Sequence, residues 1–323
     1  MNSDKILDIL TSTSEYVSGQ SLAQTLGVSR QAVWKEINAL RERGYEIESV
    51  PNRGYRLSAT PAFPDAHAVN AALNTKIIGK ELTVLDSVGS TNDYLKNLGA
   101  NGCKSGTVVA AREQVSGKGR LGREWQSKKD ENVMFSLLIR PKLAPTEVAA
   151  VTPLTGLAVC KALRRFTGLD CRIKWPNDVI IGRKKLAGIL TEMSAEFDAV
   201  EYIVIGIGVN VDQADFPCDI AQKATSLFLE AGVRYDKNKA LACLLDQIEE
   251  EFLKNDLSLS GEALDEYTAL CATVGKNVSF TRGGVTVGGL AVGIAQSGEL
   301  KVKLADGVVC LVNSGEVTAQ GIY

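Results

Sequence analysis

QVSGKGRLGREW, residues 114–125, combines three glycines, three cations and one tryptophan in one short stretch. The glycines allow backbone conformations closed to other residues and let a ligand lie against the main chain. Lys118, Arg120 and Arg123 supply positive charge, and arginine binds carboxylate or phosphate oxygens through two parallel hydrogen bonds. The ring of Trp125 can cover another ring. On composition alone a solvated basic loop is the simpler interpretation, so a nucleotide-like ligand is favoured only if matching segments follow.

Two common nucleotide-binding motifs do not fit this chain. A P-loop needs Gly-x4-Gly-Lys followed by Ser or Thr, but Arg112 stands at the first glycine position and Gly119 follows Lys118. The later segment Gly206–Val211 lacks the last glycine of Gly-x-Gly-x-x-Gly, because Val211 fills that place. The pattern therefore excludes P-loop ATPases and Rossmann dehydrogenases.

The totals are those of a globular protein of two or three domains. The 323 residues are 45% hydrophobic and 23% charged, and the net charge of -2 argues neither for nor against a nucleic-acid partner. No apolar run approaches the ~18 residues of a membrane span, and the N-terminus does not resemble a signal peptide. The seven cysteines are scattered without Cys-x-x-Cys pairs, which indicates reduced thiols and a cytoplasmic location.

The chain has a single histidine, His67. This excludes zinc sites built on several histidines and a Ser-His-Asp triad that relies on another histidine. Any chemistry must therefore depend on lysine, arginine, aspartate, asparagine and the backbone.

Residues 1–60 have the pattern of a winged helix-turn-helix domain. The segment from Ser21 to Arg43 has helix-turn-helix spacing, with Gly27 ending one helix and Ser29 as the N-cap of the next. Two alternating segments around a turn at residues 51–54 predict a β-hairpin wing.

The exposed face predicted for the third helix, with the wing tip, carries side chains suited to DNA. Arginine and glutamine read base edges, and lysine and arginine bind phosphate. The candidate DNA-binding residues are Ser29, Arg30, Gln31, Trp34, Lys35 and Arg53. Seven cations balance seven acids in residues 1–60, so a winged helix used for protein contacts remains an alternative. A dimer presenting two half-sites would compensate for weak binding by one domain.

The remaining chain divides into three predicted parts. Residues 61–72, with prolines and alanines, form a candidate linker, and residues 73–270 predict an α+β domain with a mixed sheet and helices on one side. A helix is expected over residues 238–252, with Asp246, Glu249, Glu250 and Glu251 on its solvated face. Residues 271–323 show short alternating strands between glycine turns, which predicts a small β-barrel.

Five segments, taken in order, resemble the motifs of the biotin protein ligases. They are Ser90–Asn92, Gly117–Trp125, Lys174–Asp178, Lys185–Leu190 and Gly206–Asn210. With the N-terminal winged helix, the chain is similar to the bifunctional members of this family, which also repress the biotin operon. The resemblance covers essentially the whole chain, and it implies a C-terminal barrel like an SH3 fold.

The resemblance implies a two-step reaction. Biotin and ATP, with Mg2+ on the phosphates, form biotinyl-5′-AMP, and the biotinyl group then passes to a lysine of a carboxylase carrier domain. The first step brings two anions together, so it needs positioning and charge neutralisation rather than a general base. Such chemistry agrees with a chain that holds one histidine.

Roles carry over by position in the motifs. Catalytic roles are implied for Lys185, Arg120 and Asp178. The implied biotin-binding residues are Ser90, Thr91, Asn92, Gln114, Lys118, Gly119, Arg120, Lys185 and Gly206. The implied nucleotide-binding residues are Arg123, Trp125, Asn177, Gly208 and Asn210. Lys118 stands where the family often has arginine, which keeps the charge and loses the bidentate geometry.

Residues 212–226 are expected to form a second cover over the adenylate, with Phe216 as their one aromatic residue. If the adenylate orders both covers, it could favour a homodimer that presents two winged helices to operator DNA. Three alternatives stay open at this point: a lipoate ligase, a regulator that binds biotin or its adenylate without ligating, and a ligase whose DNA-binding domain is vestigial.

Overall fold

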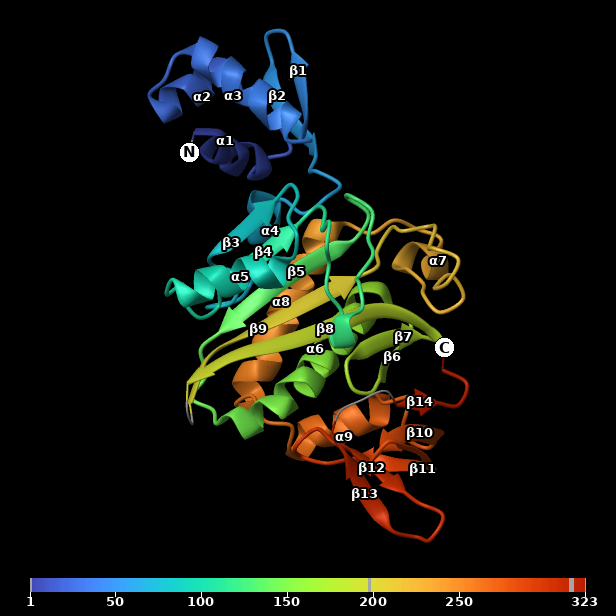
Figure 1. The fold of residues 1–323 in the computed structure, drawn as a ribbon. Coiled ribbons are helices and arrows are strands. Elements are labelled where there is room, and N and C mark those ends of the chain that lie inside the picture. Colours follow the sequence, from blue (N-terminus) through green and yellow to red (C-terminus); the bar gives the residue numbers. More distant parts are fainter. Residues whose placement is uncertain (1, 197–198, 314–316, 323) are drawn as a thin grey trace.

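The computed structural model describes residues 2–196, 199–313 and 317–322. The chain forms an N-terminal helical domain, a central sheet domain and a C-terminal domain of strands, which follow one another along the molecule (Figure 1).

The N-terminal domain is three helices and a hairpin, as predicted. Its elements are α1 (Asn2–Thr11), α2 (Gly19–Leu26), α3 (Arg30–Glu42), β1 (Glu46–Val50) and β2 (Gly54–Ala59). The Ser29 hydroxyl accepts a hydrogen bond from the Ala32 N–H, which caps α3, and Gly27 ends α2 in the left-handed conformation at φ 67°. Val33, Ile37 and Leu40 of α3 are buried in a core that belongs to this domain alone.

The segment 61–72 is not simply a linker, which corrects our expectation. It contains helix α4 (Ala66–Ala72), capped by the side chain of Asp65. Helix α4 packs on α8 (Lys237–Asn255), where the Asn238 side chain accepts from the Asp65 N–H and donates to the Pro61 carbonyl. Alanine-rich composition indicated a connection, and the same alanines allow close helix packing.

The central domain is built on a seven-stranded mixed sheet in the order β3-β4-β5-β9-β8-β7-β6. Its strands are β3 (Leu82–Leu85), β4 (Val108–Ala111), β5 (Val133–Ile139), β6 (Cys171–Lys174), β7 (Asp178–Ile181), β8 (Lys184–Glu196) and β9 (Ala199–Val209). Strands β3 and β4 are parallel and all other neighbours are antiparallel. Gly182 and Arg183 form the turn that joins β7 to β8.

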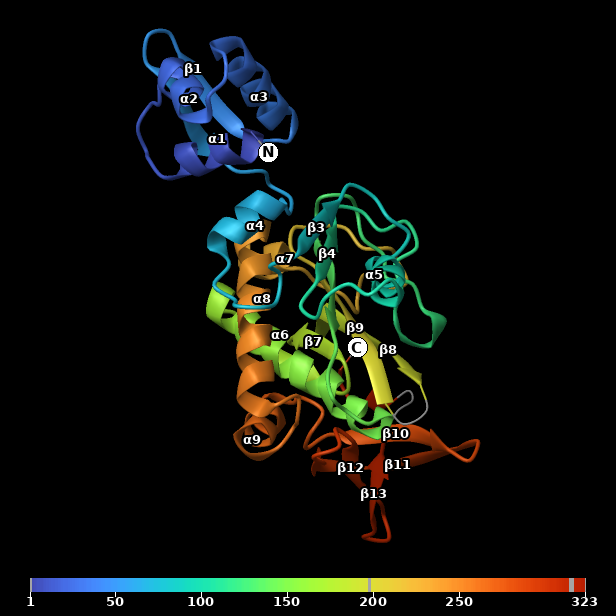
Figure 2. The ribbon, with the colours of Figure 1, turned by 90° about the vertical axis from the view of Figure 1, so that its left-hand side faces the viewer.

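Helices cover both faces of this sheet, which corrects the expectation of helices on one side (Figure 2). Helices α6 (Val151–Thr167) and α8 pack with the main core on one face. Helix α5 (Thr91–Ala100) lies on the other face, where Leu95 joins a separate cluster with Val109, Leu138 and Val204. Alternation along β4 divides the two cores, since Val108 faces one and Val109 faces the other.

Helix α6 is preceded by the 3-10 turn η2 (Pro145–Ala150). The stretch Pro145–Thr167 is long and apolar enough to cross a membrane, but 72% of its most apolar window is buried inside the protein. It is therefore the core helix of the sheet domain.

Two acids of α8 are buried, which corrects their placement on a solvated face. Glu249 is 6% exposed, and its carboxylate accepts hydrogen bonds from the backbone N–H groups of Lys76, Ile77 and Ile78. Glu251 is 1% exposed and pairs with Lys161 at 2.7 Å. These carboxylates bind α8 to residues 76–78 and to Lys161 of α6, which are contacts that the amphipathic pattern of α8 does not predict.

Helix α9 (Gly261–Leu270) leads into a five-stranded antiparallel sheet in the order β13-β12-β11-β10-β14. Its strands are β10 (Asn277–Arg282), β11 (Val285–Ile294), β12 (Leu300–Lys303), β13 (Val309–Val312) and β14 (Thr318–Ala319). Val278 and Leu300 join the main core, and the buried Trp175 indole N–H donates to the Gly298 carbonyl at 2.8 Å. The C-terminal sheet is thus packed firmly against the end of the central sheet.

Candidate active site

A narrow slot of about 50 Å3 lies where the N-terminus of α5, the glycine loop and strands β8 and β9 meet. The structure brings all nine predicted biotin-binding residues to this slot: Ser90, Thr91, Asn92, Gln114, Lys118, Gly119, Arg120, Lys185 and Gly206. These residues come from segments more than 100 positions apart in the chain, so the sheet topology assembles the slot.

Three glycines form the floor of the slot. At each of them a neighbouring side chain already occupies the space that a Cβ would need. A Cβ on Gly206 would lie well under 3.0 Å from the Asn92 Oδ1 atom. A Cβ on Gly208 would lie 2.5 Å from the Trp125 indole, and one on Gly188 would lie 2.9 Å from Lys185 Cε. Each of these glycines therefore permits a close approach that another residue would block.

A connected set of polar groups lies at one end of the slot. The Thr91 N–H and hydroxyl both donate to Gln114 Oε1, at 2.8 and 3.0 Å. The fully buried Ser136 hydroxyl lies 2.7 Å from Thr91 Oγ1 and 2.6 Å from Asn92 Oδ1. We did not identify Ser136 from sequence, although one polar residue inside the apolar strand β5 was a usable signal. It reaches the site because strand β5 pairs with strand β9, and this pairing sets Ser136 opposite Gly206.

The predicted catalytic residues gather at the other end. The Lys185 ammonium lies 2.6 Å from the Asp178 carboxylate, and the Arg120 guanidinium donates to Asn177 Oδ1 at 2.9 Å. Burial lowers the pKa of Arg120, and the charge of Arg123 adds to that effect while Asp178 opposes it. Asn177 is itself fixed by a hydrogen bond to the Ile189 carbonyl. Arg120 and Lys185 are thus both held at this partly buried end of the slot, and the Asp178 carboxylate lies beside Lys185.

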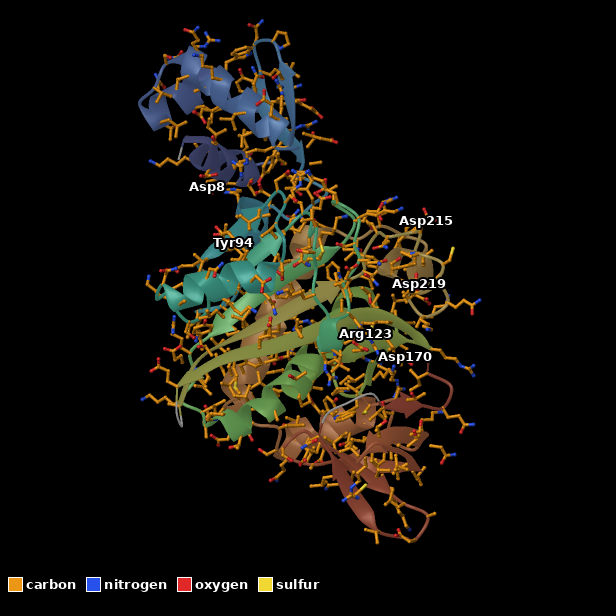
Figure 3. All side chains as sticks on the ribbon, viewed as in Figure 1. Asp8, Tyr94, Arg123, Asp170, Asp215 and Asp219 are labelled. Carbon is orange, nitrogen blue, oxygen red and sulfur yellow. The ribbon has the colours of Figure 1, made fainter. Side chains whose placement is uncertain are left out.

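A second cavity of about 670 Å3 adjoins the slot. Four of the predicted nucleotide-binding residues line it, namely Arg123, Trp125, Asn177 and Asn210, whereas Gly208 lines the slot instead. Figure 3 labels two residues that line this cavity, Arg123 of the glycine loop and Asp219 of the loop before α7 (Leu227–Ala231).

Two cations in this cavity were missed as site residues by sequence reasoning, Lys174 and Lys223. Burial lowers the pKa of Lys174 to about 8, and repulsion from Lys185 and Arg123 acts in the same direction. The lysine of the segment Lys174–Asp178 was a usable signal, whereas Lys223 comes from an irregular segment with no pattern of its own.

Comparison with known proteins gives the same assignment for each part. The profile of the Biotin/lipoate A/B protein ligase family matches residues 84–210, that of a helix-turn-helix domain matches 2–56, and that of the biotin protein ligase C-terminal domain matches 273–318. The chain is 36% identical to the bifunctional ligase/repressor BirA of Bacillus subtilis, over 91% of both chains. The chain belongs to the biotin protein ligase family.

Two further similarities agree with that assignment. The chain is 30% identical to the BirA of Escherichia coli, over 96% of this chain and 94% of that protein. The solved structure of the Aquifex aeolicus biotin protein ligase in complex with biotin and ATP has 30% identity and a TM-score of 0.64, and it covers 75% of this chain.

The glycine loop of this family member is closed at its base. Arg112 at the loop's beginning binds Asp130 at its end through two bonds of 2.6 and 2.7 Å. Inside the loop the Trp125 N–H donates to the Gly117 carbonyl, and Leu121 takes a left-handed conformation at φ 58°. The Trp125 ring lies against Gly208, with the Lys185 ammonium 5.5 Å from its centroid. The indole thus borders both the slot and the larger cavity.

The second expected cover, residues 212–226, is largely irregular and follows β9. Its base is fixed by an ion pair between the buried side chains of Asp212 and Lys237. Phe216, Ile220 and Lys223 of this segment line the larger cavity. This segment therefore forms part of the wall of the larger cavity.

The winged helix of this ligase family member presents the predicted DNA face to solvent. Arg30, Gln31, Trp34 and Lys35 of α3 are exposed, with 55% of Trp34 accessible. The guanidinium of Arg53 at the wing lies over the Tyr16 ring, 4.5 Å from its centroid. Ser29 serves as the N-cap of α3, so its hydroxyl already has a structural role.

Proposed function

We propose that this chain is an ATP-dependent biotin protein ligase that is also a DNA-binding repressor. The observation that carries the ligase proposal is the junction of the two cavities. Gly119, Arg120, Trp125, Asn177 and Lys185 line both of them. A small bicyclic ligand in the slot and a nucleotide in the larger cavity would therefore meet at two cations.

Biotin fits the slot by chemistry. Its ureido ring offers two N–H donors and one carbonyl acceptor, and the end of the slot near α5 carries the hydroxyls and amides of Ser90, Thr91, Asn92 and Gln114. The glycine floor lets the bicyclic ring system lie close to strands β8 and β9. The carboxylate at the end of the valeryl chain would then extend towards Arg120 and Lys185.

In the first step a biotin carboxylate oxygen attacks the α-phosphorus of ATP, and the bond to the bridging oxygen of pyrophosphate breaks. The nucleophile is already ionised, so no general base is needed. Lys185 and Arg120 hold the two negative groups together and neutralise the charge that builds up on the phosphoryl oxygens. The products are biotinyl-5′-AMP and pyrophosphate.

In the second step the amine of a carrier lysine attacks the acyl carbon and AMP leaves. Asp178, paired with Lys185 at 2.6 Å, lines the larger cavity beside the position of the mixed anhydride. We propose that its carboxylate orients the incoming ammonium and accepts its proton. Lys185 stays on the acyl and phosphoryl oxygens and supports departure of AMP.

Magnesium enters with the ATP phosphates as part of the substrate. Across residues 2–196, 199–313 and 317–322 no three histidine, cysteine or carboxylate side chains gather as metal ligands. Asp178 and Asp219 line the cavity that we assign to the nucleotide, and hard carboxylate oxygens suit this ion.

The repressor function rests on the exposed α3 face and on a homodimer. We propose that biotinyl-AMP orders the covers at 114–125 and 212–226, that the ordered covers favour a homodimer, and that two winged helices then bind operator DNA.

We also place the protein in the cytoplasm, where its seven unpaired cysteines stay reduced, and we assign an SH3-like barrel to residues 271–323.

The ligase proposal is tested by incubating the protein with MgATP and either biotin or lipoate, and by measuring pyrophosphate and the acyl-adenylate. We expect adenylate from biotin and none from lipoate, because lipoate has no ureido group for the polar end of the slot. Adenylation of lipoate in place of biotin would contradict the proposal.

Sedimentation gives the second test, and an equal dimerisation constant with and without biotinyl-AMP would contradict the corepressor role.

A further inference from the structure

The side chain of Asn92 lies in the slot with both ends of its amide engaged. Its Nδ2 donates to Glu192 Oε2 at 2.7 Å and more weakly to the Leu190 carbonyl at 3.4 Å. Its Oδ1 accepts from the buried Ser136 hydroxyl at 2.6 Å. Asn92 is 3% exposed, whereas Glu192 on β8 does not line the slot and has no role in the proposed reaction.

Glu192 fixes which way the Asn92 amide points. An ionised carboxylate can only accept hydrogen bonds, so the atom that faces it must be the amide nitrogen. The oxygen is then held on the opposite side, beside Gly206, whose missing Cβ leaves room for it. The two ends of an amide have nearly the same shape, so without the carboxylate either end could occupy that place.

Glu192 is itself held by a chain of charges. The Lys96 ammonium on α5 lies 2.8 Å from Glu192 and 3.0 Å from Asp93, and Asp93 lies 2.6 Å from the Lys118 ammonium of the glycine loop. Burial acts to lower the pKa of Lys96, but its bonds to Glu192 and Asp93 hold that pKa above the usual value. The carboxylate is therefore held in place by a cation on the neighbouring helix.

The orientation of Asn92 matters for the ligand that the slot accepts. A ureido N–H needs an oxygen as its partner, and an amide turned over would present N–H against N–H. A site built to hydrogen-bond a polar group discriminates strongly against arrangements that leave buried polar groups unpaired. The Asn92 oxygen can thus accept a hydrogen bond from a ureido N–H only while the Asn92 nitrogen is bound to Glu192.

We propose that Glu192 is a positioning residue that keeps the Asn92 oxygen directed at the slot and so sets specificity for a ureido ligand. This inference rests on the proposed function, since it assigns a residue to recognition of biotin. Glu192 acts through Asn92, and Lys96 holds Glu192 in place. The network links ligand recognition on α5 to strand β8 and, through Asp93, to the glycine loop.

The test is Glu192→Gln, which keeps the shape and lets the neighbouring amides pair in either direction. We expect KM for biotin to rise about tenfold, with kcat and KM for ATP changed less than twofold. Desthiobiotin, which keeps the ureido ring and lacks the sulfur, should lose affinity by the same factor. Glu201→Gln is the matched control, because Glu201 is an exposed glutamate on β9 bonded to Ser194. It should leave all constants unchanged.

A double-mutant cycle separates positioning from general support of the fold. In an Asn92→Ala background, Glu192→Gln should cause no further rise in KM for biotin, because its effect passes through the missing amide. Equal effects in both backgrounds would overturn the inference. So would an unchanged KM in Glu192→Gln, or a parallel loss of kcat and of ATP affinity.

Two results keep this test distinct from the proposed function. If the wild-type protein forms no biotinyl-AMP, the proposed function fails; if it does and Glu192→Gln behaves like wild type, only the role of Glu192 fails. Should Glu192→Gln not fold, Lys96→Met releases the same carboxylate from its outer partner. A rise of about threefold in KM for biotin is then expected, and no rise would overturn the inference.

Discussion

Lys185 is the residue on which the proposed chemistry depends most. Its ammonium borders both cavities and lies 2.6 Å from Asp178. We predict that Lys185→Ala lowers the rate of biotinyl-AMP formation by about 10²–10³-fold, the usual effect of removing one group that stabilises transition-state charge. Lys184→Ala is the control, because Lys184 is adjacent and exposed. Near-normal turnover of Lys185→Ala, with its fold intact, would remove Lys185 from the mechanism.

The glycine at 206 is predicted to be essential for ligand binding. A Cβ there would overlap the Asn92 oxygen, so Gly206→Ala must displace the amide that the ureido ring would contact. We expect biotin affinity, measured by titration calorimetry, to fall at least about tenfold. Gly293→Ala in β11 is the control, because its new Cβ would have no neighbour closer than 4.0 Å. Unchanged biotin affinity in Gly206→Ala would contradict this role.

Local motifs predicted most of the candidate site residues, and the fold added the rest. Ser90, Gln114 and Lys185 lie in or beside recognisable motifs, and the structure brings them into one slot. Ser136 joins them only because β5 pairs with β9 in a register that sets it opposite Gly206. Glu192 reaches Asn92 across 100 positions of sequence. Pairing between distant strands leaves no short-range pattern, so the sequence marks Ser136 only as a polar residue in an apolar strand and does not mark Glu192 at all.

At the scale of elements, helix α8 is anchored by a buried carboxylate. Burial disfavours ionisation of Glu249, but hydrogen bonds from the backbone N–H groups of residues 76–78 hold its pKa below the usual value. The stabilisation is therefore present above the pKa of an unfolded glutamate and is lost as the pH falls through the lower pKa of the folded state. The carboxylate contributes to stability at neutral pH and not in acid.

Glu249→Gln should lower the free energy of unfolding by about 1–3 kcal/mol at pH 7, because one end of the amide cannot accept from backbone N–H groups. The difference from wild type should shrink in acid, where the wild-type carboxylate also takes up a proton. Urea denaturation at a series of pH values measures both effects. Glu250→Gln serves as the control, since Glu250 is exposed on the same helix. A difference that grows in acid would contradict the assignment.

The exposed face of helix α3 is predicted to carry DNA recognition. Arg30→Ala should weaken operator binding about tenfold, which is within the 1–3 kcal/mol of a base contact, and should leave biotin ligation unchanged. Lys5→Ala is the control, because Lys5 is an exposed cation on α1 and does not belong to the helix that carries the proposed contacts. Fluorescence anisotropy at fixed salt concentration gives the affinities. Equal affinity of Arg30→Ala and wild type would favour a winged helix that makes only protein contacts.

Element types were easier to predict than their packing partners. Apolar spacing correctly predicted a helix over residues 238–252, which forms as α8. The same spacing does not say which face of the sheet a helix covers, and α5 packs opposite to α6. The buried acids of α8 were misplaced because a charged residue in an amphipathic helix is usually solvated.

At the scale of the whole molecule, residues 61–65 lie between the winged helix and residues near the two proposed covers. The ring of Phe63 lies 3.7 Å from the guanidinium of Arg112, which closes the glycine loop. Asn238 holds Pro61 and Asp65 and is adjacent to Lys237, the partner of Asp212. Asp65 also pairs with Arg43 at the end of α3. The winged helix is thus connected through Asp65 to a segment that contacts Arg112 and Asn238, near the two proposed covers.

The most direct test of the ligase assignment uses the whole protein with MgATP, biotin and a purified carrier domain, followed by intact mass measurement of the carrier. The junction of slot and nucleotide cavity at Arg120 and Lys185 predicts a gain of one biotinyl group. No gain while the protein retains biotinyl-AMP would contradict ligation and indicate a sensor that only regulates. No gain and no adenylate would contradict the interpretation of the glycine loop itself.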